Sequence, residues 1–254
     1  MSLQLDGRRL AMLDAMGIKL FLPDARLHAE VGTPAAPVRQ ASDEPARAAG
    51  MVTRSSQPKP SQARSDIELM EWDALEQTVA ACRACKLCEG RTNTVFGVGD
   101  RNADWLLVGE APGENEDLRG EPFVGQAGKL LDNMLKALGL DRASKVYIAN
   151  VLKCRPPANR NPQPDEVVQC EPFLRRQVQL LQPKIILAMG RFAVQTLLGT
   201  TEPIGKLRGR VHQYAGVPVV ATYHPAYLLR NLPDKAKAWA DLCFAQELLR
   251  KNSG

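Results

Sequence analysis

Residues 105–117 read WLLVGEAPGENED and carry the strongest fold signal in the chain. The apolar run from Trp105 to Val108 is short and ends at Gly109, as a buried strand does where it enters a turn. The residues of the turn are small, so its backbone N–H groups can approach a ligand closely. This stretch predicts a buried strand with a ligand-facing loop at its carboxyl end.

Three more apolar runs have the same character, at residues 146–149, 184–189 and 217–223. Helical patterns separate the runs, over residues 126–138, 165–181, 191–198 and 235–249. Strands that alternate with helices predict an α/β fold with a mainly parallel sheet covered on both faces.

Polar segments follow three of the predicted strands. They are residues 109–117, Asn150 and the pair His224-Pro225. In open α/β sheets, ligands bind outside the carboxyl ends of the strands, so we expect these segments to share one pocket.

The chain has 254 residues, of which 44% are hydrophobic, and a formal net charge of +5. It has no apolar run of about 18 residues, so no membrane span is expected. The first residues lack the apolar core and cleavage site of a secretory signal, which predicts a cytoplasmic location. The mild basic excess suits a nucleic-acid partner without proving one.

Composition divides the chain into three parts. Residues 31–66 are rich in Pro, Ala, Ser, Arg and Gln and predict a disordered linker. The linker joins a folded domain, residues 67–254, to a short N-terminal segment, residues 1–30. Residues 13–23 are similar to a clamp-loader psi-subunit peptide, and Leu20-Phe21 resembles a sliding-clamp motif. The segment is therefore a candidate docking peptide for a replication clamp or clamp loader, and packing on its own domain is the alternative.

Six cysteines occur in a chain for which a reducing compartment is expected, which favours metal ligands over disulfides. Cys82 and Cys85 have the two-residue spacing that lets two sulfurs bind one metal centre. Cys154 and Cys170 could complete a set of four, for either a [4Fe–4S] cluster or zinc. Cys88 could be a third ligand or a neighbour. The remaining cysteine, at position 243, lies in an apolar helical stretch and reads as a core residue.

Several motifs in order resemble those of the family 4 uracil-DNA glycosylases, from about residue 82 to residue 249. They are Cys82-x-x-Cys85, GEAPGENED at 109–117, GEPFVG at 120–125, NVLKCRPP at 150–157, Cys170 and HPAYLLR at 224–230. The resemblance implies a three-layer α/β/α sandwich. It also implies a structural [4Fe–4S] cluster held by Cys82, Cys85, Cys154 and Cys170.

The implied substrate is DNA that contains uracil, and the implied reaction is hydrolysis of the N-glycosidic bond. In this interpretation Phe123 stacks on the flipped base. The Asn150 carboxamide pairs with the N3–H and O4 edge of uracil, a pattern that cytosine does not match. His224 donates a hydrogen bond to the charge that develops at uracil O2.

The turn from Gly109 through Glu110 and Ala111 would lie against the base. Ala111 stands where the related family 1 enzymes carry an aspartate, so Glu110 is the first candidate for positioning water. The reserves are Glu116 and Asp117. Gly113 stands where family 1 carries a tyrosine, so thymine exclusion must come from elsewhere.

Residues after His224 are expected to contact DNA. Leu228 is the candidate wedge for the gap that the flipped base leaves. Candidate phosphate contacts are Lys206, Arg208, Arg210 and Arg230. We expect the protein to be a monomer.

Two alternatives stay open. A family 5 or cross-linking relative would keep the fold, although the cross-linking type has a histidine in a basic loop where residues 153–161 have none. A non-catalytic metal-containing module would bind nucleic acid and release no base.

Overall fold

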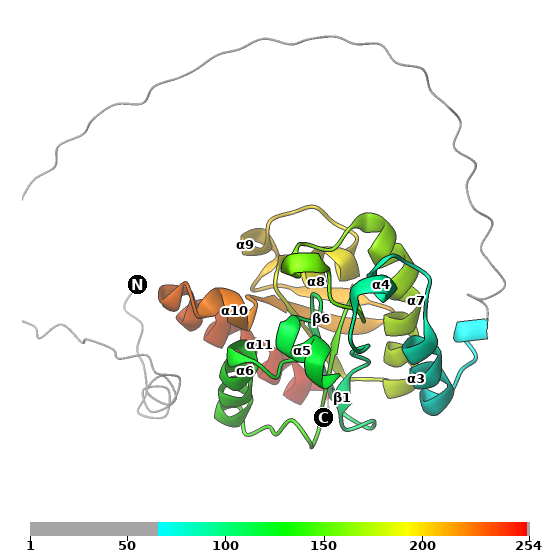
Figure 1. The fold of residues 1–254 in the computed structure, drawn as a ribbon. Coiled ribbons are helices and arrows are strands. Elements are labelled where there is room, and N and C mark those ends of the chain that lie inside the picture. Colours follow the sequence, from blue (N-terminus) through cyan, green and yellow to red (C-terminus); the bar gives the residue numbers. More distant parts are fainter. Residues whose placement is uncertain (1–65, 253–254) are drawn as a thin grey trace, which may run out of the picture.

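The computed structural model describes residues 66–252 and contains a six-stranded sheet. The strand predicted at residues 105–108 is β2 (Trp105–Gly109), which lies inside this sheet. The strand order is β1-β3-β2-β4-β6-β5, and Figure 1 shows the sheet with the helices around it. The inner strands β3 (Val146–Asn150), β2, β4 (Ile185–Met189) and β6 (Val217–Thr222) are parallel. The edge strands β1 (Val98–Gly99) and β5 (Val211–Tyr214) are antiparallel to their neighbours. The predicted α/β class with a mainly parallel sheet is confirmed.

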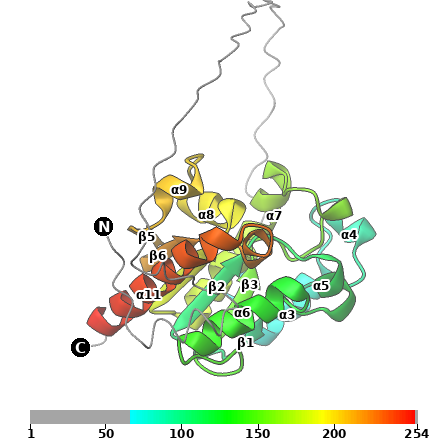
Figure 2. The ribbon, with the colours of Figure 1, turned by 90° about the vertical axis from the view of Figure 1, so that its left-hand side faces the viewer.

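Helices cover both faces of the sheet, as Figure 2 shows. One face packs against α7 (Pro164–Leu181) and α8 (Arg191–Leu198). The other packs against α6 (Gln126–Ala137) and α11 (Lys235–Asn252). These four helices lie where the sequence predicts them, and they complete the three-layer sandwich.

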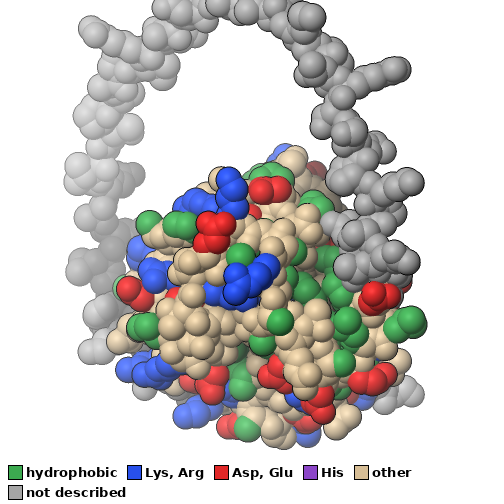
Figure 3. Space-filling view, turned by 45° about the vertical axis from the view of Figure 1, so that its right-hand side comes forward, with side chains coloured by type: hydrophobic (Ala, Val, Ile, Leu, Met, Phe, Trp, Pro, Cys, Tyr) green, Lys and Arg blue, Asp and Glu red, His purple; other side chains and the backbone are tan. Residues whose placement is uncertain are grey.

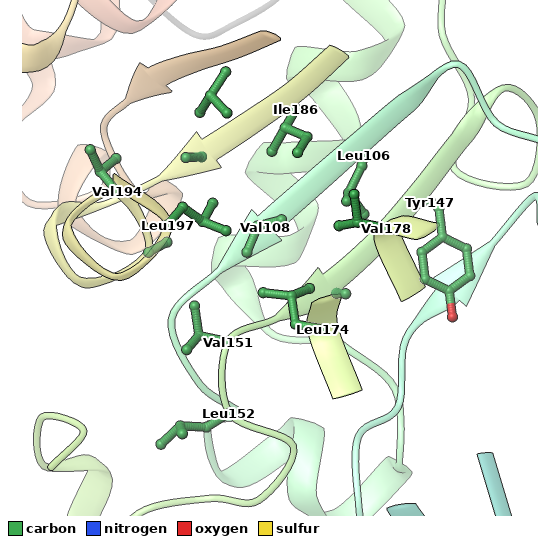
Figure 4. Packing of buried hydrophobic residues seen from close by; sticks show 14 of the residues in the cluster. Leu106, Val108, Tyr147, Val151, Leu152, Leu174, Val178, Ile186, Val194 and Leu197 are labelled. Carbon is green, nitrogen blue, oxygen red and sulfur yellow. The ribbon is translucent and has the colours of Figure 1, made fainter. Parts of the chain in front are cut away.

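Alternation along β2 divides the core between the two faces. Leu106 and Val108 point toward the layer of α7 and α8, where Leu174 and Val178 meet them (Figure 4). Trp105 and Leu107 face the opposite layer. All of β2 is buried, because a sheet covered on both faces leaves its inner strands no solvent-facing side.

Several short elements are absent from the sequence prediction. They are α3 (Trp72–Ala81), α4 (Leu87–Gly90), α5 (Glu114–Arg119), η1 (Pro157–Asn159), α9 (Ile204–Leu207), α10 (Pro225–Leu228) and η2 (Leu232–Asp234). The helix α3 buries Leu75 and Val79 against Phe173 of α7. This packing makes residues 72–81 part of the folded domain.

The predicted docking peptide and nearly all of the predicted linker lie outside the described residues, so both stay predictions. Within residues 66–252, no helix has both the length and the apolar character needed to cross a bilayer.

Candidate functional site

The carboxyl ends of the four inner strands open into a cavity of about 820 Å³. Glu110 follows β2, Asn150 ends β3, Gly190 follows β4 and His224 comes shortly after β6, and all four line this cavity. The three polar segments named from the sequence therefore meet in one place, as expected.

The wall after β4 is missing from the sequence prediction. It consists of Gly190, Arg191 and Phe192. The sequence did contain a signal for this wall, because Gly190 directly follows the apolar run 184–189, as Gly109 directly follows the apolar run 105–108.

Gly109 and Asn150 are direct partners across β2 and β3. A Cβ atom on Gly109 would lie 2.4 Å from the Asn150 Oδ1 atom and 2.7 Å from Cζ of Phe123. Gly109, which the sequence interpretation places against the base, does not line the cavity itself. Its missing side chain leaves the space that the amide and the ring occupy.

The side chain of Asn150 is 2% exposed, and its Oδ1 atom has no hydrogen-bond partner in the described part of the chain. A buried acceptor without a donor costs about 1–3 kcal/mol. A ligand N–H that reached this oxygen would recover that free energy.

His224 caps the short helix α10, where its Nδ1 atom accepts a hydrogen bond from the Ala226 backbone N–H at 3.1 Å. Burial lowers the pKa of His224 to about 4, so the ring is neutral at pH 7. A neutral imidazole that accepts at Nδ1 carries its proton on Nε2. The ring is thus a neutral Nε2–H donor at the wall of the cavity.

Two close contacts fix the position of the His224 ring. Gly190 has a φ of 91°, and a Cβ atom there would lie 2.9 Å from Cβ of His224. The ring of Phe123 stacks on the imidazole, with a centroid separation of 5.3 Å and an interplanar angle of 29°.

The backbone of Phe123 is unusual. Its φ is 56°, in the left-handed region, and its side chain is 6% exposed. A bulky residue in this region stores about 1–3 kcal/mol of strain and persists only where the surroundings hold it. Phe123 lines the cavity from the loop between α5 and α6.

The carboxyl group of Glu110 faces a partly desolvated environment. Burial raises the pKa of Glu110 to about 7, and the charge of Arg191 acts in the opposite direction. Glu110 is therefore poised to gain or lose a proton near neutral pH. Its neighbour Ala111 also lines the cavity, as the sequence interpretation expects of this turn.

The two reserve carboxylates hold backbone groups. Glu116 accepts from the N–H groups of Gly113 at 3.1 Å, Val124 at 3.0 Å and Gly125 at 3.2 Å. It lines the cavity while tying the turn after β2 to the loop of Phe123.

Asp117 is 3% exposed and does not line the cavity. It accepts from the N–H groups of Thr92 and Asn93. These contacts give Asp117 a structural role, which leaves Glu110 as the carboxylate best placed for chemistry.

The structure disagrees with Leu228 as a wedge. Leu228 is 0% exposed and packs into the core beneath α10. The next residue, Leu229, is 42% exposed and presents an apolar side chain to solvent. The sequence has two adjacent leucines, and the fold turns the second one outward.

The basic residues named from the sequence separate into two groups. Arg208 is engaged internally: it pairs with buried Asp241 at 2.7 Å and lies over the ring of Tyr223. Arg230 lines the cavity and is exposed, whereas Lys206 and Arg210 are exposed outside the lining. Arg208 is therefore a poor phosphate contact, and Arg230 is the best placed of the four.

Basic side chains near the cavity also include Arg160 and Arg191, which line it. On the face seen in Figure 3, Lys and Arg side chains are interspersed with Asp and Glu. That face has no uniformly basic surface.

A second, smaller cavity is lined by five cysteines: Cys82, Cys85, Cys88, Cys154 and Cys170. The Cys154 Sγ atom accepts a hydrogen bond from Nη1 of Arg91 at 3.1 Å. Burial raises the pKa of Cys170 to about 12, so a free thiolate there is strongly disfavoured. Among the described residues, no set of three or more Cys, His, Asp or Glu side chains has the close arrangement of a single-ion site. The five cysteines therefore line one cavity, but their side chains are not as close together as the ligands of a single metal ion.

Comparison with known proteins agrees with this arrangement. Residues 96–243 match the family model described as the uracil DNA glycosylase superfamily, and the chain belongs to that superfamily. Within it the chain belongs to the type-4 uracil-DNA glycosylases.

The type-4 enzyme of Archaeoglobus fulgidus is 46% identical over 165 residues, which cover 62% of this chain and 82% of the relative. The type-4 enzyme of Thermotoga maritima is 45% identical and covered to 85% of its length, over 65% of this chain. A type-5 uracil-DNA glycosylase of Pyrobaculum aerophilum is 36% identical over 52% of this chain and 66% of its own length.

The close approach at Gly109 makes a prediction about stability. Gly109→Ala should lower the free energy of unfolding by about 1–3 kcal/mol, as overpacking does, because Asn150 or Phe123 must move. Urea unfolding measures this change. Gly90→Ala is the matched control, since nothing lies within 4 Å of a Cβ atom there. Equal effects in the two variants would contradict the steric argument.

Proposed function

We propose that this protein removes uracil from DNA by hydrolysing the N-glycosidic bond, leaving an abasic site. The observation that carries the proposal is the meeting of Asn150, Phe123 and His224 around one cavity. Membership of the type-4 family, and relatives named as uracil-DNA glycosylases, support the same activity. The substrate is DNA that contains uracil, and we expect the protein to associate with the nucleoid.

Recognition starts with extrusion of the base from the stack, at a cost of a few kcal/mol. Stacking on Phe123 returns about 1–3 kcal/mol. The Asn150 Oδ1 atom, which has no donor within the described chain, accepts the uracil N3–H, and the amide Nδ2 donates to O4. Cytosine has an acceptor at N3 and a donor at C4, so both contacts become mismatched.

Bond breaking places negative charge on uracil and positive charge on the sugar. The electron pair of the bond to C1′ moves to uracil N1 and is delocalised to O2. There the neutral Nε2–H of His224 stabilises it, as an oxyanion-hole donor does. The ionised carboxylate of Glu110 stabilises the sugar cation, orients the water that adds to C1′ and accepts its proton, and the released uracil anion takes up a proton from solvent.

Contacts with DNA outside the cavity follow from exposure. Leu229, in place of Leu228, is the apolar side chain available to fill the gap left by the flipped base. Arg230 and Arg160 lie at the cavity and suit the phosphates that flank the target nucleotide.

We also propose that a [4Fe–4S] cluster is held by Cys82, Cys85, Cys154 and Cys170. Its role would be to stabilise the fold. The residues fit such a group: the thiols converge on one cavity, and Arg91 donates to Cys154. Cations near the sulfurs suit a thiolate-ligated cluster, because thiolates bring negative charge into a buried place. The ligands come from the segment before α4, from the loop after β3 and from α7, so the cluster would tie these three together.

The activity is tested by release of free uracil from a labelled oligonucleotide. His224→Ala should lower the rate about 10²–10³-fold, because it removes the donor to O2. His212→Ala is the control, since the His212 ring bonds the Leu207 carbonyl, lies on the edge strand β5 and does not line the cavity. Equal rates for the two histidine variants would contradict the role of His224.

The recognition role of Asn150 makes a separate prediction. Asn150→Asp should release uracil more slowly and discriminate less against cytosine, because an ionised carboxylate only accepts hydrogen bonds and cannot donate to O4 as the amide does. The measurement compares uracil- and cytosine-containing oligonucleotides of the same sequence. Asn102→Asp, an exposed change, should alter neither rate. Retained discrimination in Asn150→Asp argues against base reading by the amide.

The raised pKa of Glu110 predicts the pH dependence. Below pH about 7 its carboxyl group is protonated and cannot stabilise a cation or accept a proton from water. The single-turnover rate should therefore rise with pH through about 7. His224 does not titrate in this range, since its pKa is about 4. Glu110→Gln should lower the plateau rate about 10²-fold and remove the rise. If the pH dependence of Glu110→Gln is the same as that of the wild type, Glu110 is not the group that titrates.

The proposed cluster predicts a brown protein with a broad absorbance near roughly 400 nm, as iron–sulfur proteins have. Cys170→Ser should abolish the colour and the bound iron and lower the melting temperature. Cys243→Ser is the control, because Cys243 lies on α11 and does not line the cysteine cavity. A colourless wild-type protein that binds zinc stoichiometrically would replace the cluster with a zinc site.

A further inference from the structure

The position of the Phe123 ring depends on support from outside its own loop. Residues 121–125 have no helix or strand, and Phe123 holds a left-handed backbone that an aromatic residue does not favour by itself. Its ring is nevertheless aligned with the imidazole of His224. Contacts from other elements must therefore select this conformation.

One support is the guanidinium group of Arg142, in the turn between α6 and β3. Its Nη1 atom donates to the Pro122 carbonyl at 2.9 Å, and its Nη2 atom donates to the Phe123 carbonyl at 2.8 Å. The Nε atom donates to Oδ1 of Asp132 on α6 at 3.0 Å. One planar guanidinium group thus joins two successive carbonyls of the loop to a helix. A lysine ammonium group lacks this planar arrangement of donors and could not make the same contacts.

The second support is the backbone of α6 itself. A Cβ atom on Gly128 would lie 1.8 Å from the Phe123 carbonyl oxygen, so the helix packs directly against that peptide. The Phe123 carbonyl is therefore held between Arg142 and α6. Rotation of the Phe123 backbone toward the common region would remove the contacts of this carbonyl.

We propose that Arg142 is a positioning residue for base binding: it fixes the backbone of Phe123 so that the ring presents its face to the flipped base. The inference rests on the proposed function, which assigns Phe123 to stacking. Arg142 does not line the cavity, so it would act through Phe123 and not by direct contact with the base. Asp132 orients the guanidinium group through its ion pair with Arg142, so it contributes to the same positioning of Phe123.

The test compares Arg142→Ala with Arg101→Ala. Arg101 is the control, because its guanidinium group is likewise bound by other side chains, in ion pairs with Asp73 and Glu76, but lies away from the cavity. Two affinities are measured for each variant: inhibition by free uracil, which needs the stacking ring, and binding of an oligonucleotide with an abasic site, which does not.

Arg142→Ala should weaken inhibition by uracil about tenfold, within the range that a lost base-stacking contact gives. Binding of the abasic oligonucleotide should change less than about twofold. Added guanidinium chloride at millimolar concentration should restore part of the uracil affinity in Arg142→Ala, and sodium chloride at the same ionic strength should not. Arg101→Ala should match the wild type in both affinities. If Arg142→Ala does not fold, Asp132→Asn should give the same selective loss at smaller amplitude.

Unchanged uracil inhibition in a folded Arg142→Ala overturns the inference. So does an equal loss of uracil and abasic-DNA affinity, since it indicates general damage to the domain. A wild-type protein that releases no uracil overturns the proposed function instead, and this outcome is seen in the same series before any variant is compared.

Discussion

The pairing of Gly109 with Asn150, at the carboxyl ends of two neighbouring parallel strands, is the constraint on which the site depends. It sets the amide of Asn150 beside a residue without a side chain, and the ring of Phe123 fills the rest of that space. The backbone pairing continues beyond the ends of the strands: the N–H groups of Val151 and Leu152 donate to the carbonyls of Gly109 and Glu110, respectively. A shift of one residue would turn Asn150 to the other face of the sheet and break the whole arrangement.

The same short segment also connects the cavity with the cysteines. Lys153 is fully buried between Asn150 and Cys154, and its Nζ atom donates to the carbonyls of Asn150 and Phe96 and to Oε1 of Gln177. None of these three acceptors is a carboxylate, which is unusual because a buried ammonium group is normally paired with a negative charge. These contacts link the strand end to α7, so the backbone that carries the Asn150 amide is anchored on both sides.

The sheet and the shared cavity could be predicted from sequence because both follow from local patterns. Apolar runs mark the strands, and parallel strands place their carboxyl ends together. Other features depend on distant contacts: the left-handed backbone of Phe123 is stabilised by Arg142 and Gly128 from another element. The choice between Leu228 and Leu229 depends on how a four-residue helix sits on the core, and a helix that short has no periodicity to read.

The stacked rings of Phe123 and His224 have a consequence for how the cavity is filled. Their centroid separation of 5.3 Å lies within the 4.5–7 Å range of aromatic pairs in direct contact, so no layer remains between them for a third ring. An incoming pyrimidine therefore cannot be sandwiched between the two rings and must stack on a part of the phenyl ring that the imidazole leaves uncovered. A base that offers no edge contacts then gains little from stacking alone.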